Sequence, residues 1–461
     1  MEEKRIWKKN DELILTIEDL GSEGEGIGHV DGYALFVKNA VPGDKIKAKI
    51  IKAKKNYGYA IIQELMEPSP WRAEPVCPIA GKCGGCQMQH ISYEKQLEFK
   101  RNKVYNCLKR IGGLEDIEVE PVIGMENPYH YRNKAQYPVG LDKEGGLITG
   151  FYAGRTHTIM PADTCYIQHP VNEEILRIIK DFMREYRIKP YDEKTGKGLV
   201  RHIITRVGYS TGEIMVCLVI NGSSLPHSEK LTERLAQIKG MKSICLNINQ
   251  ENTNVILGEK IIPLFGEPYI CDYIGEIKYR ISPLSFYQVN PEQTRKLYEK
   301  ALEFAGLTGK ETVWDLYCGI GTISLFLAKQ AKKVCGVEIV PRAIEDAKWN
   351  AKENGIDNAE FFAGAAEDVL PAVYKESGGS LRADVIVVDP PRKGCEESLL
   401  DTIADMEPER IVYVSCDPAT LARDLKYLGS RGYRVNKVQP VDMFGHSRHV
   451  ETVVLLERKT L

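Results

Sequence analysis

The sequence predicts a multidomain protein that ends in an α/β, doubly wound, Rossmann-like domain. Three observations support this fold class. The 461 residues are too many for one ordinary domain. Residues 1–65 hold short apolar runs separated by glycine turns, which is typical of a small β-barrel. From about residue 290, apolar strand-like runs alternate with helical patterns, which indicates a parallel sheet covered by helices.

The first predicted domain, residues 1–65, contains four strand-like runs: "ELILTI", "YALFV", "KIKAKI" and "YGYAIIQE". A stretch at 45–59 contains six lysines, two tyrosines and no acidic residue. Two interpretations stay open. The lysines could protect a solvated edge strand, or they could contact phosphates beside aromatic side chains that stack on bases.

The second predicted domain, residues 66–285, is a mixed α/β unit whose topology the sequence does not define. It begins with a proline-rich linker, "EPSPWRAEP", and a cysteine cluster. A basic amphipathic helix is expected at 92–111, and it is a candidate for packing on the C-terminal domain. Further helices are expected near 170–187 and 226–238.

The third predicted domain, residues 286–461, opens with the strand and glycine turn "TVWDLYCGIG". Gly319 and Gly321 allow a tight turn that a ligand can approach closely. The third glycine of a dinucleotide fingerprint is missing, because Ser324 stands there. Glu338 ends the next strand, where a carboxylate can accept hydrogen bonds from both ribose hydroxyls. S-adenosylmethionine therefore fits this site better than NAD.

Composition and charge restrict the expected location of the protein and the state of its cysteines. The net charge is −2, so charge alone does not indicate a nucleic-acid-binding protein. No apolar run approaches the roughly 20 residues of a membrane span, and the charged start "MEEKRIWKKN" is unlike a signal peptide. We expect a cytoplasmic protein with no membrane association and no evident obligate protein partner. Its twelve cysteines would be reduced, so a cluster of them indicates metal binding or catalysis.

Three clustered cysteines, Cys77, Cys83 and Cys86, lie on a glycine-rich loop in "CPIAGKCGGCQMQH". Three thiolates on such a loop can reach one metal centre. Thiolate ligands suit zinc and an iron–sulfur cluster equally.

Five motifs, in this order, resemble the RNA uracil-5-methyltransferase family: "SFYQVNPEQ", "DLYCGIGT", "VVDPPRKG", "SCDPATLARD" and "HVETVVLL". The chain is most similar to the bacterial 23S ribosomal RNA branch, whose members carry an RNA-binding TRAM barrel and an iron–sulfur cluster. The transfer RNA branch typically lacks both. The resemblance implies S-adenosylmethionine as the methyl donor and RNA as the partner, with 23S rRNA favoured over tRNA.

The resemblance also assigns catalytic roles. Cys416 is the nucleophile that adds to carbon-6 of uracil and so activates carbon-5, and Glu451 is the general base. Asp417 is expected to cap a helix that begins with Pro418. The positive helix end would lower the pKa of the Cys416 thiol and Asp417 would raise it, so the sequence leaves the net direction open.

The cofactor contacts implied by the resemblance are Gln288, Tyr317, Thr322, Glu338 and Asp389. Phe286 is either a platform for an extruded base or a core residue. The fourth metal ligand implied by the family is Cys165, and the family favours a 4Fe–4S cluster, with zinc as the alternative. A second class of function is a non-catalytic, metal-stabilised RNA-binding factor, although every catalytic position is occupied.

Overall fold

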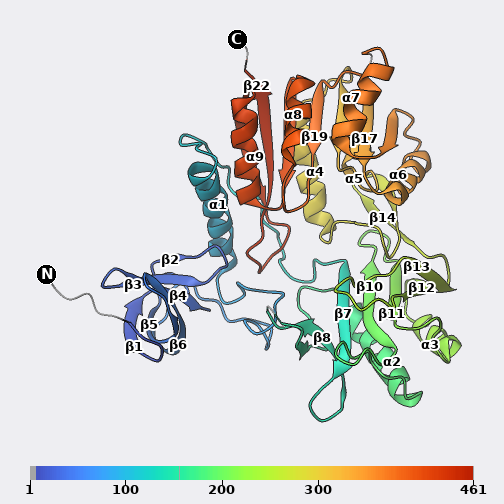
Figure 1. The fold of residues 1–461 in the computed structure, drawn as a ribbon. Coiled ribbons are helices and arrows are strands. Elements are labelled where there is room, and N and C mark those ends of the chain that lie inside the picture. The colour runs from blue at the N-terminus through green and yellow to red at the C-terminus, as the bar shows by residue number, and fades with distance from the viewer. Residues whose placement is uncertain (1–6, 155, 380, 460–461) are drawn as a thin grey trace.

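The computed structural model describes residues 7–154, 156–379 and 381–459. In this part of the chain, Figure 1 shows an N-terminal barrel in blue, a central sheet in green and a C-terminal sheet flanked by helices in orange and red. Helix α1 (Tyr93–Arg110) stands between the barrel and the C-terminal sheet. Within the same ranges, no helix is long and apolar enough to cross a membrane.

The N-terminal sheet has the strand order β1-β5-β6-β4-β3-β2. Alternate side chains such as Leu35, Ile46 and Ile50 fill its interior. The sheet curls onto itself and brings β3 close to β1. A Cβ atom at Gly28 in β3 would lie only 2.5 Å from the backbone oxygen of Thr16 in β1. Its strands are β1 (Glu12–Thr16), β2 (Asp19–Leu20), β3 (Gly26–Val30), β4 (Tyr33–Lys38), β5 (Lys45–Ala53) and β6 (Tyr57–Glu67).

The lysine-rich strand β5 pairs with β1 on one side and β6 on the other. The interpretation of this stretch as an edge strand is therefore wrong. Lys47 forms an ion pair with Glu12, and Lys45 forms one with Glu67, so neighbouring strands partly neutralise the lysine-rich face.

The predicted linker is tightly bound to the barrel. The buried carboxylate of Asp44 accepts hydrogen bonds from the guanidinium of Arg72 at 2.7 and 2.8 Å and from the backbone of Ser69 at 2.9 Å. The segment that leaves the barrel therefore has a fixed path toward α1.

The central sheet has the order β13-β12-β11-β10-β7-β8-β9. Helices α2 (Val171–Glu185) and α3 (Ser228–Leu235) bury one of its faces, which confirms both predicted helices. Its strands are β7 (Lys134–Leu141), β8 (Leu147–Tyr152), β9 (Ile159–Pro161), β10 (Val200–Val207), β11 (Ile214–Ile220), β12 (Met241–Ile248) and β13 (Lys260–Phe265).

A hairpin of β14 (Ile270–Ile274) and β15 (Ile277–Ile281) packs into the core of the C-terminal unit rather than onto the central sheet. Ile270, Ile277 and Tyr279 share an apolar cluster with Val313 and Leu325. The hairpin also contacts the central domain, because Asp272 accepts hydrogen bonds from the backbone of Tyr209 and Ser210. The boundary between residues 285 and 286 therefore stays a prediction.

The C-terminal sheet has the order β18-β17-β16-β19-β20-β22-β21. Neighbours from β18 to β20 are parallel, and β22 is antiparallel to both β20 and β21. The doubly wound arrangement is confirmed. Its strands are β16 (Thr312–Leu316), β17 (Lys333–Glu338), β18 (Ala359–Ala363), β19 (Val385–Val388), β20 (Arg410–Ser415), β21 (Tyr433–Val441) and β22 (Glu451–Arg458).

Helices cover both faces of this sheet. One apolar cluster joins one face to α4 (Pro291–Ala305), α5 (Thr322–Ala328) and α6 (Pro341–Glu353). A second joins the other face to α7 (Ala366–Glu376), α8 (Glu397–Asp405) and α9 (Pro418–Ser430). Val104 and Leu108 of α1 belong to the second cluster beside Leu421 of α9. Helix α1 therefore packs on the C-terminal unit, as the sequence suggested.

Candidate active site and cysteine centre

Several predicted site residues lie at one edge of the C-terminal sheet. In a parallel sheet the carboxyl ends of the strands meet at that edge, where ligands bind. The antiparallel strand β22 begins at this edge, so its first residue joins the others. The residues placed there are Tyr317 after β16, Glu338 at the end of β17, Asp389 after β19, Cys416 after β20 and Glu451 at the start of β22.

The turn after β16 has left-handed backbone at Tyr317 (φ 70°), Gly319 (φ 55°) and Gly321 (φ 82°). The backbone N–H of Gly319 donates to one carboxylate oxygen of Glu338 at 3.2 Å, and that of Val340 donates to the other at 3.0 Å. These bonds hold the carboxylate against the glycine turn. Each oxygen keeps a lone pair for a further donor, as a ribose hydroxyl requires.

Thr322 begins α5, directly after this turn. Its hydroxyl accepts a hydrogen bond from Tyr298 at 3.0 Å, and its carbonyl accepts one from Tyr279 at 2.9 Å. Gln288 lies just before α4 and is buried. Its carbonyl accepts a hydrogen bond from the Asn133 amide at 3.0 Å, so the central domain helps to fix this segment.

Cys416 directly follows β20, and Glu451 begins the neighbouring strand β22. The antiparallel register pairs Ser415 with Thr452, and the next residues toward the ligand edge are Cys416 and Glu451. The Glu451 side chain is only 4% exposed. Burial, followed by the negative charge of Asp389, raises the pKa of Glu451 to about 8.

Burial also raises the pKa of Cys416 to about 12, with further contributions from the charges of Glu451 and Asp389. Burial raises the pKa of Asp389 to about 7. Two carboxyl groups with pKa values near neutrality therefore flank a protonated thiol. Such a cluster can exchange protons with a substrate near neutral pH.

The helix that follows Cys416 has the predicted cap. The Asp417 side chain accepts hydrogen bonds from the backbone of Ala419 at 2.9 Å and of Thr420 at 3.2 Å, and Pro418 is the first helical residue. The sequence left open whether the pKa of Cys416 is raised or lowered, and in the structure it is raised. The loss of solvent contributes most to this shift, and the negative charges of Glu451, Asp389 and Asp417 add to it.

Arg392 is a site residue whose electrostatic role the sequence did not predict. Its positive charge opposes the upward shifts in the pKa values of both Cys416 and Glu451. It follows the Pro-Pro pair after Asp389 and is exposed to solvent. The sequence places it inside the motif "VVDPPRKG", although the motif does not show which groups its charge would reach.

Phe286 is 72% exposed, which excludes its interpretation as a core residue. The backbone beside it is fixed, because the buried guanidinium of Arg206 donates to the carbonyl of Ser285. A solvent-facing ring on a fixed backbone suits stacking on a base.

The four predicted metal ligands come together. Cys77, Cys83, Cys86 and Cys165 line one cavity of about 350 Å³. Burial raises the pKa of Cys86 to about 12, and the other three cysteines add to the shift. The backbone N–H of Gly85 also donates to the Cys83 sulfur at 3.4 Å.

The arrangement of these thiols falls short of a formed metal site. Throughout the described ranges, no group of three or more Cys, His, Asp or Glu side chains is arranged to hold a metal ion. The four thiols nevertheless fit a tetrathiolate centre by donor type and by their convergence on one cavity. Arg132 and Lys134 line the same cavity and can offset the negative charge of thiolates.

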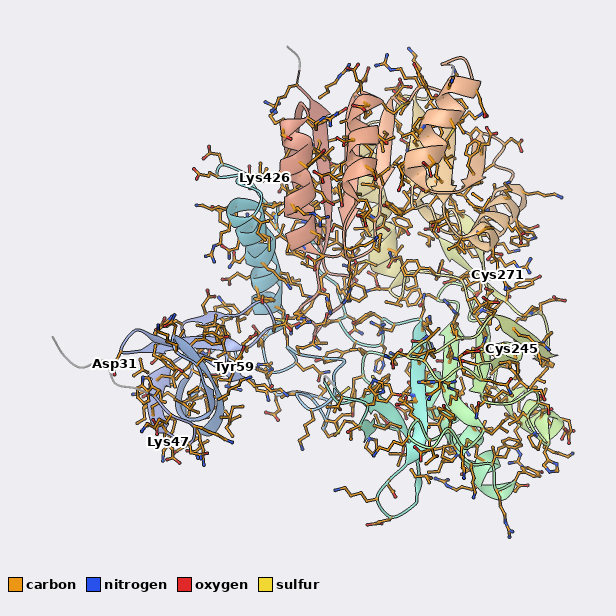
Figure 2. All side chains as sticks on the ribbon, in the orientation of Figure 1. Asp31, Lys47, Tyr59, Cys245, Cys271 and Lys426 are labelled. Atoms are coloured by element: carbon orange, nitrogen blue, oxygen red, sulfur yellow. The ribbon has the colours of Figure 1, made fainter. Side chains whose placement is uncertain are left out.

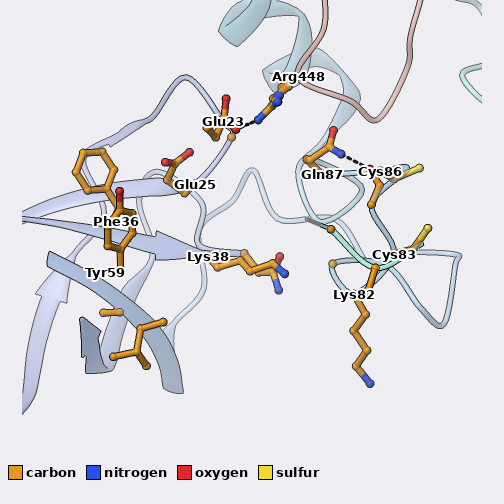
Figure 3. Close-up of a pocket in the computed structure, with 18 of the residues that line it drawn as sticks. Glu23, Glu25, Phe36, Lys38, Tyr59, Lys82, Cys83, Cys86, Gln87 and Arg448 are labelled. Carbon is orange, nitrogen blue, oxygen red and sulfur yellow. Dashed lines mark hydrogen bonds and ion pairs between the residues drawn. The ribbon is translucent and has the colours of Figure 1, made fainter. Parts of the chain in front are cut away.

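A larger cavity of about 820 Å³ lies between the barrel and the cysteine loop (Figure 3). Phe36 and Tyr59 line it from the barrel, with ring centroids 5.6 Å apart. Lys38 and Lys82 add positive charge to its wall, whereas Arg448 forms an ion pair with Glu23 on the same wall. Figure 2 shows Tyr59 on the side of the barrel nearest the central sheet. This surface combines cations with stacking rings, as single-stranded nucleic acid requires.

A glycine turn beside a ribose-type carboxylate, with proton-exchanging groups at the same sheet edge, places the chain among the Rossmann-like, cofactor-dependent enzymes. Comparison with known proteins defines the family. The model of the tRNA (uracil-5-)-methyltransferase family matches residues 92–459, and the TRAM domain model matches residues 7–62. The chain belongs to the tRNA (uracil-5-)-methyltransferase family.

Relatives agree with this assignment over nearly the full length. An uncharacterized RNA methyltransferase of Halalkalibacterium halodurans is 55% identical over 452 residues, covering 98% of both chains. One of Clostridium acetobutylicum is 53% identical over 454 residues with the same coverage. The crystal structure of Pyrococcus abyssi tRNA (uracil-54, C5)-methyltransferase in complex with S-adenosyl-L-homocysteine matches with a TM-score of 0.78 and 30% identity. That match covers 96% of this chain and 98% of the other.

Proposed function

We propose that this chain transfers a methyl group from S-adenosylmethionine to carbon-5 of a uridine in 23S ribosomal RNA. The observation that carries the proposal is the pairing of Cys416 with the buried carboxyl Glu451 at the sheet edge that follows the glycine turn. Family membership supports the reaction class.

The cofactor contacts would come from residues already described at this edge. S-adenosylmethionine, when bound, supplies a methyl group on a positively charged sulfur. Glu338 would accept hydrogen bonds from its ribose, and the turn from Tyr317 to Thr322 would lie against it. Gln288 and Asp389 would complete the contacts. The crystal structure of the Pyrococcus abyssi relative with S-adenosyl-L-homocysteine supports this cofactor class.

The side chains suit covalent catalysis. The Cys416 thiolate adds to carbon-6 of the uracil ring, and the ring electrons that this addition displaces make carbon-5 nucleophilic enough to take the methyl group. Glu451 then accepts the carbon-5 proton. The electron pair of the broken carbon-5–hydrogen bond forms the double bond between carbon-5 and carbon-6, and the bond between sulfur and carbon-6 breaks with its electron pair leaving on sulfur, so the Cys416 thiolate is released.

The pKa values restrict these steps. The thiol must lose its proton before it attacks, and its pKa of about 12 makes transfer to Asp389, with a pKa of about 7, unfavourable until bound substrate and cofactor lower the thiol pKa. Arg392 favours the resulting thiolate. Glu451, with a pKa of about 8, is mostly protonated at neutral pH, so only its ionised fraction accepts the carbon-5 proton, and in that form it is a stronger base than an exposed glutamate.

Two surfaces would hold the RNA. The barrel, proposed as the RNA-binding domain over residues 1–65, and the cysteine loop together form the larger cavity with Phe36, Tyr59 and its cations. Phe286 would stack on the extruded base or its neighbour. Stacking of this kind is worth about 1–3 kcal/mol per base.

We propose a 4Fe–4S cluster held by Cys77, Cys83, Cys86 and Cys165, with zinc as the alternative. Their convergence on one cavity and the N–H···S bond to Cys83 support a tetrathiolate centre. Elemental analysis of anaerobically purified protein tests this proposal. About four iron atoms per chain support the cluster, one zinc supports the alternative, and neither metal refutes both.

A second candidate substrate is transfer RNA. The Pyrococcus abyssi tRNA (uracil-54, C5)-methyltransferase matches 96% of this chain, so the N-terminal barrel alone no longer favours ribosomal RNA. Mapping 5-methyluridine in both RNAs, from cells with and without the protein, separates the two. Loss of the modification from 23S rRNA supports the proposal, and loss from tRNA alone supports the alternative. No loss from either RNA would favour a non-catalytic RNA-binding factor.

A further inference from the structure

The loop of residues 442–450 joins β21 to β22 and runs directly into the base Glu451. We name it the base loop. Other parts of the described chain hold it along its length. Tyr131 of the segment before β7 donates to the carbonyl of Gly445 at 3.1 Å. Gln293 of α4 donates to the carbonyl of Asp442 at 3.0 Å.

A buried ion pair fixes the start of the base loop. The ammonium of Lys100 in α1 lies 2.5 Å from Asp442 and donates to the carbonyl of Phe444 at 3.0 Å. The side chains of Lys100 and Asp442 are both 0% exposed. The other oxygen of Asp442 accepts a hydrogen bond from Tyr93 at 2.7 Å.

The middle of the base loop contacts the cysteine loop. The backbone N–H of His446 donates to the Gln96 side chain of α1 at 3.0 Å. Its carbonyl accepts hydrogen bonds from the backbone of Gln87 at 3.0 Å and of Met88 at 2.9 Å. His446 has φ 63°, a left-handed conformation that a non-glycine residue keeps only where its surroundings enforce it.

A buried ion pair is a poor device for stability alone, because apolar residues of similar volume often serve as well. It can instead specify one arrangement of the elements that it joins. This pair joins residues 342 positions apart in the chain and fixes the loop that ends at Glu451. We propose that Lys100 and Asp442 are positioning residues for Glu451, which hold it where it can take the carbon-5 proton. This inference rests on the proposed function.

The reaction has two stages that can be measured separately. RNA with 5-fluorouridine at the target has no carbon-5 proton to lose, so its covalent adduct with Cys416 forms without help from Glu451. Unmodified RNA needs Glu451 for release of the adduct. A defect in the position of the base should therefore leave the first reaction intact and slow the second.

The main variant is Lys100→Met, and Lys95→Met is its matched control on the same helix, where Lys95 pairs with Glu98 at the surface. We expect Lys100→Met to form the fluorouridine adduct within about twofold of the wild-type rate. Its turnover on unmodified RNA should fall at least about tenfold, because small displacements of catalytic groups are costly. A covalent adduct with unmodified RNA should accumulate. Lys95→Met should match the wild type in both assays.

Equal losses in the two assays would show a purely structural role and overturn the proposal, and so would unchanged turnover. If Lys100→Met does not fold, the double variant Lys100→Met/Asp442→Leu replaces the pair with apolar side chains and should keep the wild-type melting temperature. It should still accumulate the adduct on unmodified RNA, and normal turnover would overturn the inference. Failure of the wild type to form the fluorouridine adduct would instead refute the proposed function.

Discussion

Glu451 should destabilise the folded chain as the pH rises, and Glu451→Gln should remove this effect. Its pKa rises from an ordinary value of 4.5 to about 8 because the carboxyl is buried. The folded chain keeps this proton in a pH range where the unfolded chain has lost it. The stabilisation from the protonated form is complete below pH 4.5 and is lost as the pH rises through 8.

The size of the effect follows from the pKa shift. Between the two pKa values, each pH unit changes the free energy of unfolding by about 1.4 kcal/mol. Burial of the ionised carboxyl therefore costs up to about 5 kcal/mol. Between pH 5 and pH 9, the free energy of unfolding of the variant should therefore gain about 4 kcal/mol relative to the wild type. That gain is a large fraction of the roughly 5–15 kcal/mol that stabilises a typical protein.

Urea unfolding followed by tryptophan fluorescence at several pH values measures this difference. Glu457→Gln is the control, because Glu457 lies on the same strand but is partly exposed. Its difference from the wild type should not change over the same range. A change of less than about 1 kcal/mol for Glu451→Gln would mean that the carboxyl is not buried as described, and the argument for a base of raised pKa would fail.

Three further changes test the site. Cys416→Ala should lower methyl transfer by at least about 1,000-fold and abolish the fluorouridine adduct while cofactor binding persists, whereas Cys271→Ala should do neither. Phe286→Ala should raise the Kd for RNA by about 5- to 150-fold through lost stacking; Phe265→Ala, at a distant exposed ring, should leave it unchanged. Cys86→Ala should lose bound iron or zinc by elemental analysis, and metal retained at the level of Cys271→Ala would contradict the ligand set.

Local signals predicted the C-terminal fold well. Helix α6 begins at Pro341, and Gly355 just beyond its end has φ 61°, which are the positions that proline and glycine favour at the two ends of a helix. The topology of the central sheet was not predictable from such signals. Its strand β10 pairs with β7, about 70 residues earlier, and such pairings depend on packing that no local pattern encodes.

The features of the site also divide into those that the sequence predicted and those that it did not. Residues at strand ends, such as Asp389 and Glu338, were predictable because parallel strands deliver their carboxyl ends to one edge. The direction of the shift in the Cys416 pKa was not predictable, because the shift depends on burial and on the carboxyl of Glu451, which comes from another strand. The Lys100–Asp442 pair left no sequence signal, since neither residue belongs to a motif.

Helix α1 makes the C-terminal sheet dependent on a segment that comes nearly 200 residues before it in the chain. When relatives exchange their RNA-recognition domains, in the laboratory or in evolution, only some junctions in the chain therefore preserve the active site. A chimera that replaces the barrel alone can keep a native active site. One that also replaces α1 would leave the Asp442 carboxylate enclosed without its cation unless the donor sequence carries a lysine at the same turn.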